Sequence, residues 1–479
     1  MLYPFLVAGL DHGQGVKAVT SPFDGRLIAQ APVADAAAVE TALSAAYRLH
    51  RDRDGWLPLR ERIEILKRAA DIMAARAETL ALQAAQEGGK PLVDSRVEIA
   101  RAIDGLHHCV AVMREAGGEV IPMNLNAASA ARMATTCREP IGVVVAVSAF
   151  NHPVNLIVHQ VAPAVAAGCP FIVKPAGLTP LSCWHVVQIL HEAGLPEAWG
   201  QVVLTDDREV ATALVSDPRV GFFSFIGSPG VGWMLRAKLA PGARCALEHG
   251  GAAPVIVAED ADLDDMIPLL AKGGFYHAGQ VCVSVQRVFA PNALAAEIAE
   301  RIGAYGGAMT VGDPTLASTA IGPLIQPGEV DRVAQWVADA VAAGATCVAG
   351  GQRIGERCYA PTVLLNPPPT AQVSRAEIFG PVICVYGYDD IDEAIERANA
   401  LDFAFQAAVF SKHLDVALRA YRRLDASAVM INDHTAFRVD WMPFAGLRQS
   451  GYGVGGIPHT IRDMQIEKMM VLRSAELDG

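Results

Sequence analysis

Residues 141–175 read IGVVVAVSAFNHPVNLIVHQVAPAVAAGCPFIVKP. Two β-rich runs, 141–147 and 171–173, flank a helical run at 153–167. The alternation continues to Gly232, with strands expected at 202–204 and 221–225 and helices at 180–193, 209–216 and after Gly230. Strands that alternate with helices predict a parallel, doubly wound sheet, and such sheets bind ligands beyond the carboxyl ends of their strands.

A second alternating series extends from residue 253 to about residue 430, which predicts a second α/β domain. Before the first series, apolar periodicity predicts helices at 35–49, 58–86 and 94–115. Two strand-like pieces, 117–138 and 465–473, stand apart from both series. They could pair with each other, or each could cap its own sheet, and composition does not decide between these alternatives.

Composition narrows the class of protein. A chain of 479 residues predicts more than one domain, and a net charge of −12 argues against nucleic acid or an anionic membrane as a partner. No apolar run reaches the ~18 residues that a spanning helix needs. We interpret residues 1–10 as a strand, because no basic segment precedes them. The nine cysteines form no CxxC pair, which favours reduced thiols, a cytoplasmic location and no metal site.

Cys282 is the strongest candidate for a catalytic residue. It ends the segment Gly279-Gln280-Val281-Cys282, and Glu248 lies 34 residues upstream, before a glycine pair. A thiol that attacks a carbonyl and a carboxylate that then activates water are two parts of one covalent mechanism. The competing interpretation is a buried, inert thiol, and we apply that interpretation to the other eight cysteines.

Further motifs surround this pair. Asn151 precedes a helix, where a bare asparagine is usually a turn or cap residue. The segment 225–232, FIGSPGVG, follows a strand and opens a helix, an arrangement that suits a pyrophosphate but also occurs in ordinary turns. Lys174 closes the strand in 171–177, FIVKPAG, and Glu377 begins 377–382, EIFGPV.

Taken together, these motifs resemble those of the aldehyde dehydrogenase superfamily, and the resemblance extends over nearly the whole chain. It implies a Rossmann-like cofactor-binding domain (1–117 and 139–249), a catalytic domain (250–449) and a small β oligomerisation arm (118–138 and 457–479). It also implies a homodimer or homotetramer. The segment 444–451, FAGLRQSG, matches a late motif of the family that we interpret as a structural loop.

The resemblance also assigns roles to residues. Cys282 would be the nucleophile, Glu248 the base that releases the product, and Asn151 a donor to the oxyanion. The implied reaction forms a thiohemiacetal, passes a hydride to the nicotinamide and hydrolyses a thioester to the carboxylic acid. The residues expected to bind NAD or NADP are Ala149, Phe150, Lys174, Gly177, Gly227, Ser228, Val231, Gly232, Glu377 and Phe379.

Three departures from the family pattern bear on the coenzyme and on the base. Members that prefer NAD often have glutamate where this chain has Gly177, and its absence removes a repulsion against a 2′-phosphate. Asp206 and Asp207 replace a glycine-rich turn and would oppose that phosphate if they point inward. The sequence therefore leaves NAD and NADP open. His249 replaces an apolar neighbour of Glu248, with an effect that the sequence does not define.

The substrate is expected to be a small polar or anionic aldehyde. The segments around Asn151 and 437–444, FRVDWMPF, are similar to those of lactaldehyde, sulfolactaldehyde and phosphonoacetaldehyde dehydrogenases. Arg101, His152, Val281 and Arg438 are the candidate substrate-binding residues. Arg101 could bind an anionic head group with His152, or could instead pair with Glu98 or Asp104 on its own helix. Val281 stands where phosphonate-handling members have arginine.

Two other classes of function remain as alternatives. One is a dehydrogenase that transfers the thioester to coenzyme A, and the presence of Glu248 argues against it. The other is a non-catalytic protein on the same fold, which would be expected to have lost Cys282, Asn151 or Glu248.

Overall fold

The strands expected between residues 141 and 225 lie side by side in one six-stranded sheet. The computed structural model describes residues 1–477 and orders this sheet β21-β9-β8-β5-β6-β7. All neighbours are parallel except β21 and β9. The strand bounds are β5 Val143–Val147, β6 Phe171–Lys174, β7 Gly200–Val202, β8 Val220–Ile226, β9 Arg244–Glu248 and β21 Gly451–Tyr452. The chain order reverses between β5 and β8, and doubly wound sheets bind ligands at such a point.

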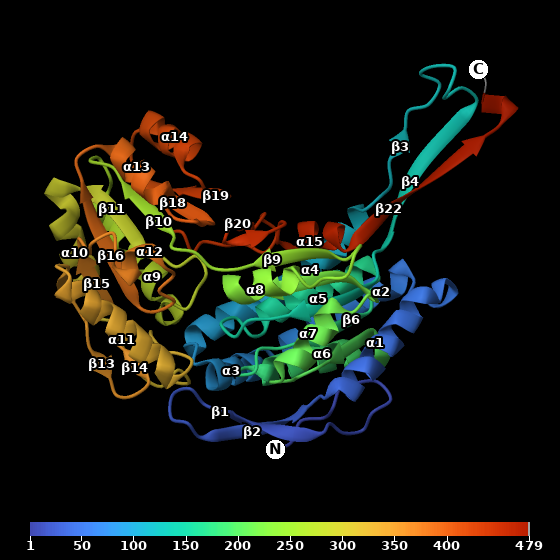
Figure 1. Ribbon diagram of the computed structural model, residues 1–479, viewed down its shortest axis with the longest axis horizontal. Helices are drawn as coiled ribbons and strands as arrows, with labels where there is room; N and C mark the ends of the chain where they lie inside the picture. Colours follow the sequence, from blue (N-terminus) through green and yellow to red (C-terminus); the bar gives the residue numbers. More distant parts are fainter. Residues whose placement is uncertain (478–479) are drawn as a thin grey trace.

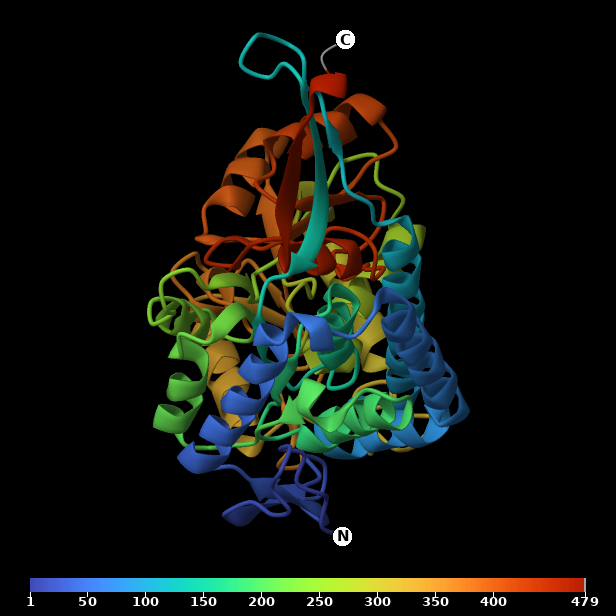
Figure 2. The ribbon, with the colours of Figure 1, turned by 90° about the vertical axis from the view of Figure 1, so that its right-hand side faces the viewer.

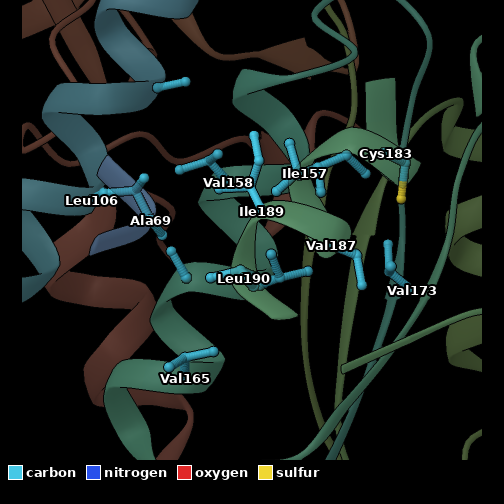
Figure 3. Packing of buried hydrophobic residues seen from close by; sticks show 14 of the residues in the cluster. Ala69, Leu106, Ile157, Val158, Val165, Val173, Cys183, Val187, Ile189 and Leu190 are labelled. Atoms are coloured by element: carbon cyan, nitrogen blue, oxygen red, sulfur yellow. The ribbon is translucent and has the colours of Figure 1, made fainter. Parts of the chain in front are cut away.

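The helices between these strands cover both faces of the sheet. Their bounds are α5 Asn155–Ala167, α6 Pro180–Glu192, α7 Arg208–Ser216 and α8 Pro229–Arg236. All residues of α5 are buried, because α4 and α15 pack on the side of α5 away from the sheet. Figure 3 shows this core, in which Ile157, Val158 and Val165 of α5 lie near Val187, Ile189 and Leu190 of α6. Fully burying one such side chain stabilises the fold by about 1.5–3 kcal/mol.

The helical periodicity near the N-terminus is confirmed with one difference. The helices are α1 Ala36–Arg51, α2 Leu59–Ala75, α3 Ala77–Gly88 and α4 Leu92–Glu115. The single helix expected at 58–86 is two helices, because Arg76 departs from helical geometry (φ −110°, ψ 13°). Residues 1–10 were expected to form a strand, which is wrong. They form only isolated bridges, Leu2 to Gln30 and Val7 to Leu10, and the first strands are the hairpin β1 Gly15–Thr20 and β2 Leu27–Val33.

The second α/β series forms a seven-stranded sheet in the order β12-β15-β16-β11-β10-β18-β19. Its strands are β10 Pro254–Val257, β11 Arg287–Pro291, β12 Thr346–Ala349, β15 Thr362–Leu365, β16 Val382–Tyr388, β18 Gln406–Phe410 and β19 Ala428–Ile431. Its main helices are α9 Leu263–Phe275, α10 Asn292–Gly307, α11 Pro327–Ala342, α13 Ile391–Asn399 and α14 Leu414–Arg423. This unit has its own hydrophobic core and lies beside the first one in Figure 1.

The two isolated strand pieces pair with each other. β22 Gln465–Arg473 runs antiparallel to β4 Arg132–Pro140 through nine residue pairs, and β3 Val120–Ile121 adds a short third strand. The resulting arm projects from the body of the molecule (Figures 1 and 2). Met469, Met470, Val471 and Leu472 of β22 are each about half exposed.

The domain boundaries given above remain a prediction. Within the range 457–479 that they assign to the arm, α15 Ile457–Asp463 packs against α4 and α5, and its Ile457 and Ile461 belong to the core of the first unit. Among the helices described, none is both long and apolar enough to cross a membrane. Within residues 1–477, no group of three or more His, Cys, Asp or Glu side chains could hold a metal ion.

Candidate active site

Chain segments from both sheets meet at a cavity of about 540 Å³. Asn151, Ser228 and Glu248 follow or end β5, β8 and β9, so they lie at the carboxyl edge of the first sheet. Cys282 and Glu377 precede β11 and β16, neighbouring strands of the second sheet, so they lie at its amino edge. Of the residues predicted from the sequence, the cavity wall contains Arg101, Ala149, Phe150, Asn151, His152, Gly227, Ser228, Val231, Glu248, Val281, Cys282, Glu377, Phe379 and Arg438.

The segment that leads to Cys282 has an unusual backbone. His277, Ala278 and Gly279 all have positive φ angles, of 48°, 53° and 71°. Left-handed non-glycine residues store strain and persist only where their surroundings hold them. The Gln280 side chain supplies such contacts, since it donates to the His277 and Pro323 carbonyls and accepts from the Ile325 amide.

The surroundings of Cys282 keep its thiol protonated in the coenzyme-free protein. Burial raises the pKa of the thiol to about 12, and the nearby positive charge of Arg438 only partly opposes this effect. Val281, Val283, Phe405 and Phe444 form an apolar cluster against Cys282. Cys282, the candidate nucleophile, therefore lies in an apolar wall, and a neighbouring positive charge or base would be needed to form its thiolate near neutral pH.

This environment predicts the pH dependence of Cys282 alkylation. A thiol with a pKa of about 12 is thiolate in a fraction that rises about tenfold per pH unit below that value. The rate of iodoacetamide labelling at Cys282, followed by peptide mass spectrometry without coenzyme, should therefore keep rising from pH 6 to pH 10. The exposed Cys137 is an internal control within the same protein. A rate that levels off by pH 7 would contradict the prediction.

Asn151 lies directly beside the nucleophile segment. Its Nδ2 donates to the Gln280 carbonyl at 2.9 Å, and the side chain is buried. An amide nitrogen carries two N–H groups, so the second remains available for another acceptor. The Asn151 side chain is therefore held against the backbone of Gln280, which is two residues before Cys282 in the chain.

A buried ion pair holds the turn that carries Asn151. Glu98 accepts from the backbone amides of Val154 and Asn155 at 2.8 and 2.9 Å, and from Lys90 Nζ at 2.8 Å. Lys90 and Glu98 are fully buried, and Lys90 also lies 5.5 Å from the Tyr276 ring centroid. Since the Tyr276 hydroxyl contacts His152 Nε2 at 3.3 Å, one polar network spans the Asn151 turn and the Cys282 segment. No sequence motif pointed to this pair.

Glu248 ends β9 and its carboxyl group lies close to Gly455. A Cβ at Gly455 would stand 2.1 Å from Glu248 Oε1, so glycine is needed there. Burial raises the pKa of Glu248, and the Arg438 charge opposes the shift. A carboxyl group with a raised pKa suits proton abstraction near neutral pH.

His249 lines the same cavity as its neighbour Glu248. Its Nδ1 lies 2.9 Å from the Gln449 carbonyl, while its Nε2 is buried without a hydrogen-bond partner. Burial lowers the pKa of His249, so the ring is neutral. A Cβ at Gly232 would stand 2.0 Å from Nε2, so Gly232 provides the space that His249 occupies.

The other half of the cavity has the features of a dinucleotide site. Gly227 and Ser228 precede α8, whose N-terminus favours a phosphate. Phe150 and Phe379 approach from opposite units, with ring centroids 5.8 Å apart. Glu377 Oε1 is buried without a partner, and burial raises the pKa of this carboxyl to about 8. An unpaired buried oxygen fits a ribose hydroxyl, so these residues are compatible with a nicotinamide coenzyme.

Lys174, Gly177 and Gly232 do not line this cavity. Lys174 ends β6, and Ala176, the neighbour of Gly177, belongs to the cavity wall. The roles of Lys174, Gly177 and Gly232 in coenzyme binding therefore remain a prediction.

Arg101 has a different partner from those expected on its own helix. Arg101 Nε and Nη2 donate to the Asp440 carboxylate at 3.0 and 2.7 Å, and neither Glu98 nor Asp104 binds it. His159 and Asn155 also contact Asp440, at 2.7 and 3.2 Å. Burial alone would raise the pKa of Asp440, but the His159 and Arg101 contacts outweigh it and hold this pKa well below its usual range. The charge of Arg101 is therefore already neutralised.

His152 is also not a cation. Burial, together with the charges of Lys90 and Arg101, holds the pKa of His152 well below its ordinary value. The neutral ring can share a hydrogen bond with Tyr276 but cannot add positive charge to the cavity.

Arg438 is the arginine of the cavity wall that forms no ion pair with a described residue, although the charges of Glu248 and Asp440 act on it. Among the three arginines of the cavity wall, Arg101 pairs with Asp440 and Arg332 with Glu329. Arg438 forms no ion pair within residues 1–477, and its Nε is buried without a partner. Its guanidinium lies 3.5 Å from the Phe444 ring centroid, and Nη2 is 3.5 Å from His159 Nδ1. A buried cation with an unpaired N–H is a candidate site for an anion.

Some residues of the cavity were missed in the sequence. Tyr276, Trp336 and Arg332 line it. Asp440 does not line it but pairs with Arg101 of its wall. Tyr276 lies close to Cys282 in sequence, which is a signal that could have been used. Trp336 and Arg332 lie on α11, which has no motif that points to a site.

Comparison with known proteins identifies the family of this site. The model of the aldehyde dehydrogenase family matches residues 11–470. The chain belongs to the aldehyde dehydrogenase family. Proteins of this family couple aldehyde oxidation to the reduction of NAD or NADP, so the chain is an NAD(P)-dependent oxidoreductase. The expected fold and reaction class are thereby confirmed.

Three relatives illustrate the range of similarity. The 3-sulfolactaldehyde dehydrogenase of Priestia aryabhattai is 38% identical over 86% of this chain and 86% of its own. The betaine aldehyde dehydrogenase of Rhizobium etli is 37% identical over 90% and 88%. The structure of aldehyde dehydrogenase 21 from Physcomitrella patens, in complex with its product succinate, has a TM-score of 0.94 at 33% identity and covers 99% of this chain and 98% of that one.

Proposed function

We propose that this protein oxidises a small aldehyde bearing an anionic group to the carboxylic acid, with Arg438 as the partner of the anion. The guanidinium of Arg438 carries this proposal, because among residues 1–477 it forms no ion pair, has an Nε without a hydrogen-bond partner and lies in the wall that also holds Cys282. The relatives named above include enzymes for anionic and for cationic aldehydes, so family membership alone does not choose between them. A buried arginine disfavours a cationic substrate, because like charges at short range repel strongly.

In the proposed reaction, the Cys282 thiolate attacks the aldehyde carbon and forms the oxyanion of a thiohemiacetal. The oxyanion accepts from the second N–H of Asn151 and from the backbone N–H of Cys282. Phe150, Phe379 and Glu377 would hold a nicotinamide coenzyme, which would supply the hydride acceptor that converts the thiohemiacetal into a thioester on Cys282. Glu248 takes a proton from water, whose oxygen attacks the thioester and releases the carboxylic acid and the thiol.

Asn151→Ala tests the oxyanion contact. Loss of one such donor typically lowers kcat by about 10²–10³-fold, and we expect a loss in this range with little change in coenzyme affinity. Steady-state kinetics, together with coenzyme titration, measure the two effects. Asn292→Ala, at the exposed start of α10 and outside the cavity wall, is the matched control and should retain full activity. A kcat within a factor of three of the wild type would contradict the role.

Arg438→Met tests the substrate class. A charge-assisted hydrogen bond contributes about 1.5–3 kcal/mol, so kcat/KM for succinic semialdehyde should fall about 10- to 100-fold relative to kcat/KM for butyraldehyde. The ratio of the two substrates is the readout, because Arg438 also acts on the pKa of Cys282 and its loss affects both aldehydes. Arg332→Met, another arginine of the cavity wall, should leave the ratio unchanged. An unchanged ratio in Arg438→Met, or a wild type that prefers betaine aldehyde, would refute the anionic substrate.

We also propose that the arm mediates homo-oligomerisation, as a dimer or tetramer. The apolar side chains of β22 are exposed on a strand that projects from the body (Figure 2). Exposed contiguous apolar surface is typical of an interaction site.

A further inference from the structure

A lysine of the N-terminal hairpin lies beside Gly177, one of the residues predicted to bind the coenzyme. Lys17 of β1 places Nζ 2.6 Å from both carboxylate oxygens of Asp206, which follows β7. A Cβ at Gly177 would stand 3.0 Å from Lys17 Nζ and 3.0 Å from Asp206 Oδ1. The ion pair therefore lies against the position that a longer side chain at residue 177 would occupy.

Lys174 adds a second positive charge at this place. It ends β6, and its Nζ contacts only the Pro175 carbonyl, at 3.5 Å, within the described part of the chain. Burial lowers the pKa of Lys174, with a raising effect of Asp206 and a lowering effect of Lys17, which shows that the three charges interact. The group lies at the carboxyl ends of β6 and β7, the edge at which a doubly wound sheet holds its dinucleotide.

From this geometry we infer that the Lys17–Asp206 pair sets the choice between NAD and NADP, and that it favours NAD. Asp206 neutralises Lys17, and its carboxylate oxygens have further lone pairs to which a ribose 2′-hydroxyl beside Gly177 can donate. A 2′-phosphate would instead meet the negative charge of Asp206, with Lys17 already engaged. Removing the carboxylate would leave two unpaired lysines around Gly177, which is a site for a phosphate.

The side chains are suited to this role. The Asp206 side chain is 61% exposed, so it can contact a ligand, whereas that of Lys17 is 23% exposed and fixed on a strand. Asp207, the next residue, is directed elsewhere, because its carboxylate caps α7 by accepting from the amides of Glu209 and Val210. The two acidic residues expected to oppose a 2′-phosphate thus have different tasks, and only Asp206 faces Gly177.

Binding of two adenosine nucleotides to the full-length protein tests this inference without catalysis. Adenosine 5′-monophosphate and adenosine 2′,5′-bisphosphate differ by the 2′-phosphate, and isothermal titration calorimetry gives both Kd values. The wild type should bind the monophosphate with equal or higher affinity. In Asp206→Asn, the ratio of affinities should shift at least tenfold toward the bisphosphate, and the shift should shrink at high salt.

Two further variants make the test specific. Asp207→Asn makes the same change of charge one residue away and retains a capping side chain, so its ratio should match the wild type. Lys17→Met leaves Asp206 without its partner and should shift the ratio toward the monophosphate. The kcat/KM ratio for NAD and NADP should follow the binding ratio in every variant. A shift below threefold in Asp206→Asn, an equal shift in Asp207→Asn, or a wild type that prefers the bisphosphate would overturn the inference.

Discussion

Cys282→Ala should lower kcat by at least about 10⁴-fold, to the background of the assay, while leaving coenzyme binding intact. Removal of a catalytic nucleophile typically causes a loss of this size, because no other group can form the covalent intermediate. The cavity wall beside Cys282 is built from Val281, Val283 and Phe444, which offer no alternative nucleophile. Formation of NAD(P)H from succinic semialdehyde measures kcat, and nucleotide titration measures binding.

A matched cysteine separates this effect from a general loss of thiols. Cys347 is half-buried on β12, outside the cavity, and Cys347→Ala should keep the wild-type rate. Residual turnover above about one per cent in Cys282→Ala would assign the nucleophile elsewhere. A wild type that is itself inactive on all aldehydes, but binds coenzyme, would instead support the non-catalytic alternative.

The sequence could predict the local order of elements because the apolar periodicity is strong in both α/β series. The strand expected at 171–173 and the helix expected at 209–216 match β6 Phe171–Lys174 and α7 Arg208–Ser216 to within one residue. The break at Arg76 was not predictable, since helical periodicity continues through it and only the packing of α2 and α3 separates them. Short-range patterns carry no information about such a change of direction.

Contacts between distant segments explain the errors about the site. Glu98 and Asp104, each one helical turn from Arg101, were the ion-pair partners considered for it. Its partner in the structure is Asp440, which is 339 residues away in the chain. Lys17 was overlooked for the same reason, since 189 residues separate it from Asp206. Motifs identify residues such as Cys282 that chemistry constrains, whereas the charge state of a pocket depends on partners that only the fold brings together.

Glu248→Gln should produce one equivalent of NAD(P)H per site and then stop. The first half of the reaction needs Cys282 and Asn151, whereas hydrolysis of the thioester needs a base near the bond. Loss of a positioned base lowers the rate by about 10²–10⁴-fold, so the acyl-enzyme should accumulate. Rapid-mixing absorbance gives the burst amplitude, and intact mass spectrometry should show the acyl group on Cys282.

The packing of Glu248 makes glutamine the suitable replacement. The Glu248 carboxyl group packs closely against Gly455, and glutamine keeps the shape of the side chain while removing the base. Glu259→Gln, at an exposed site after β10, should turn over at the wild-type rate.

Adding coenzyme A separates the two enzymatic alternatives, because an acylating dehydrogenase would release its thioester to coenzyme A even without Glu248. If Glu248→Gln regains steady turnover when coenzyme A is added, the second half of the reaction is transfer of the acyl group to coenzyme A and not hydrolysis. If the burst persists unchanged in its presence, Glu248 acts on water and the product is the free acid.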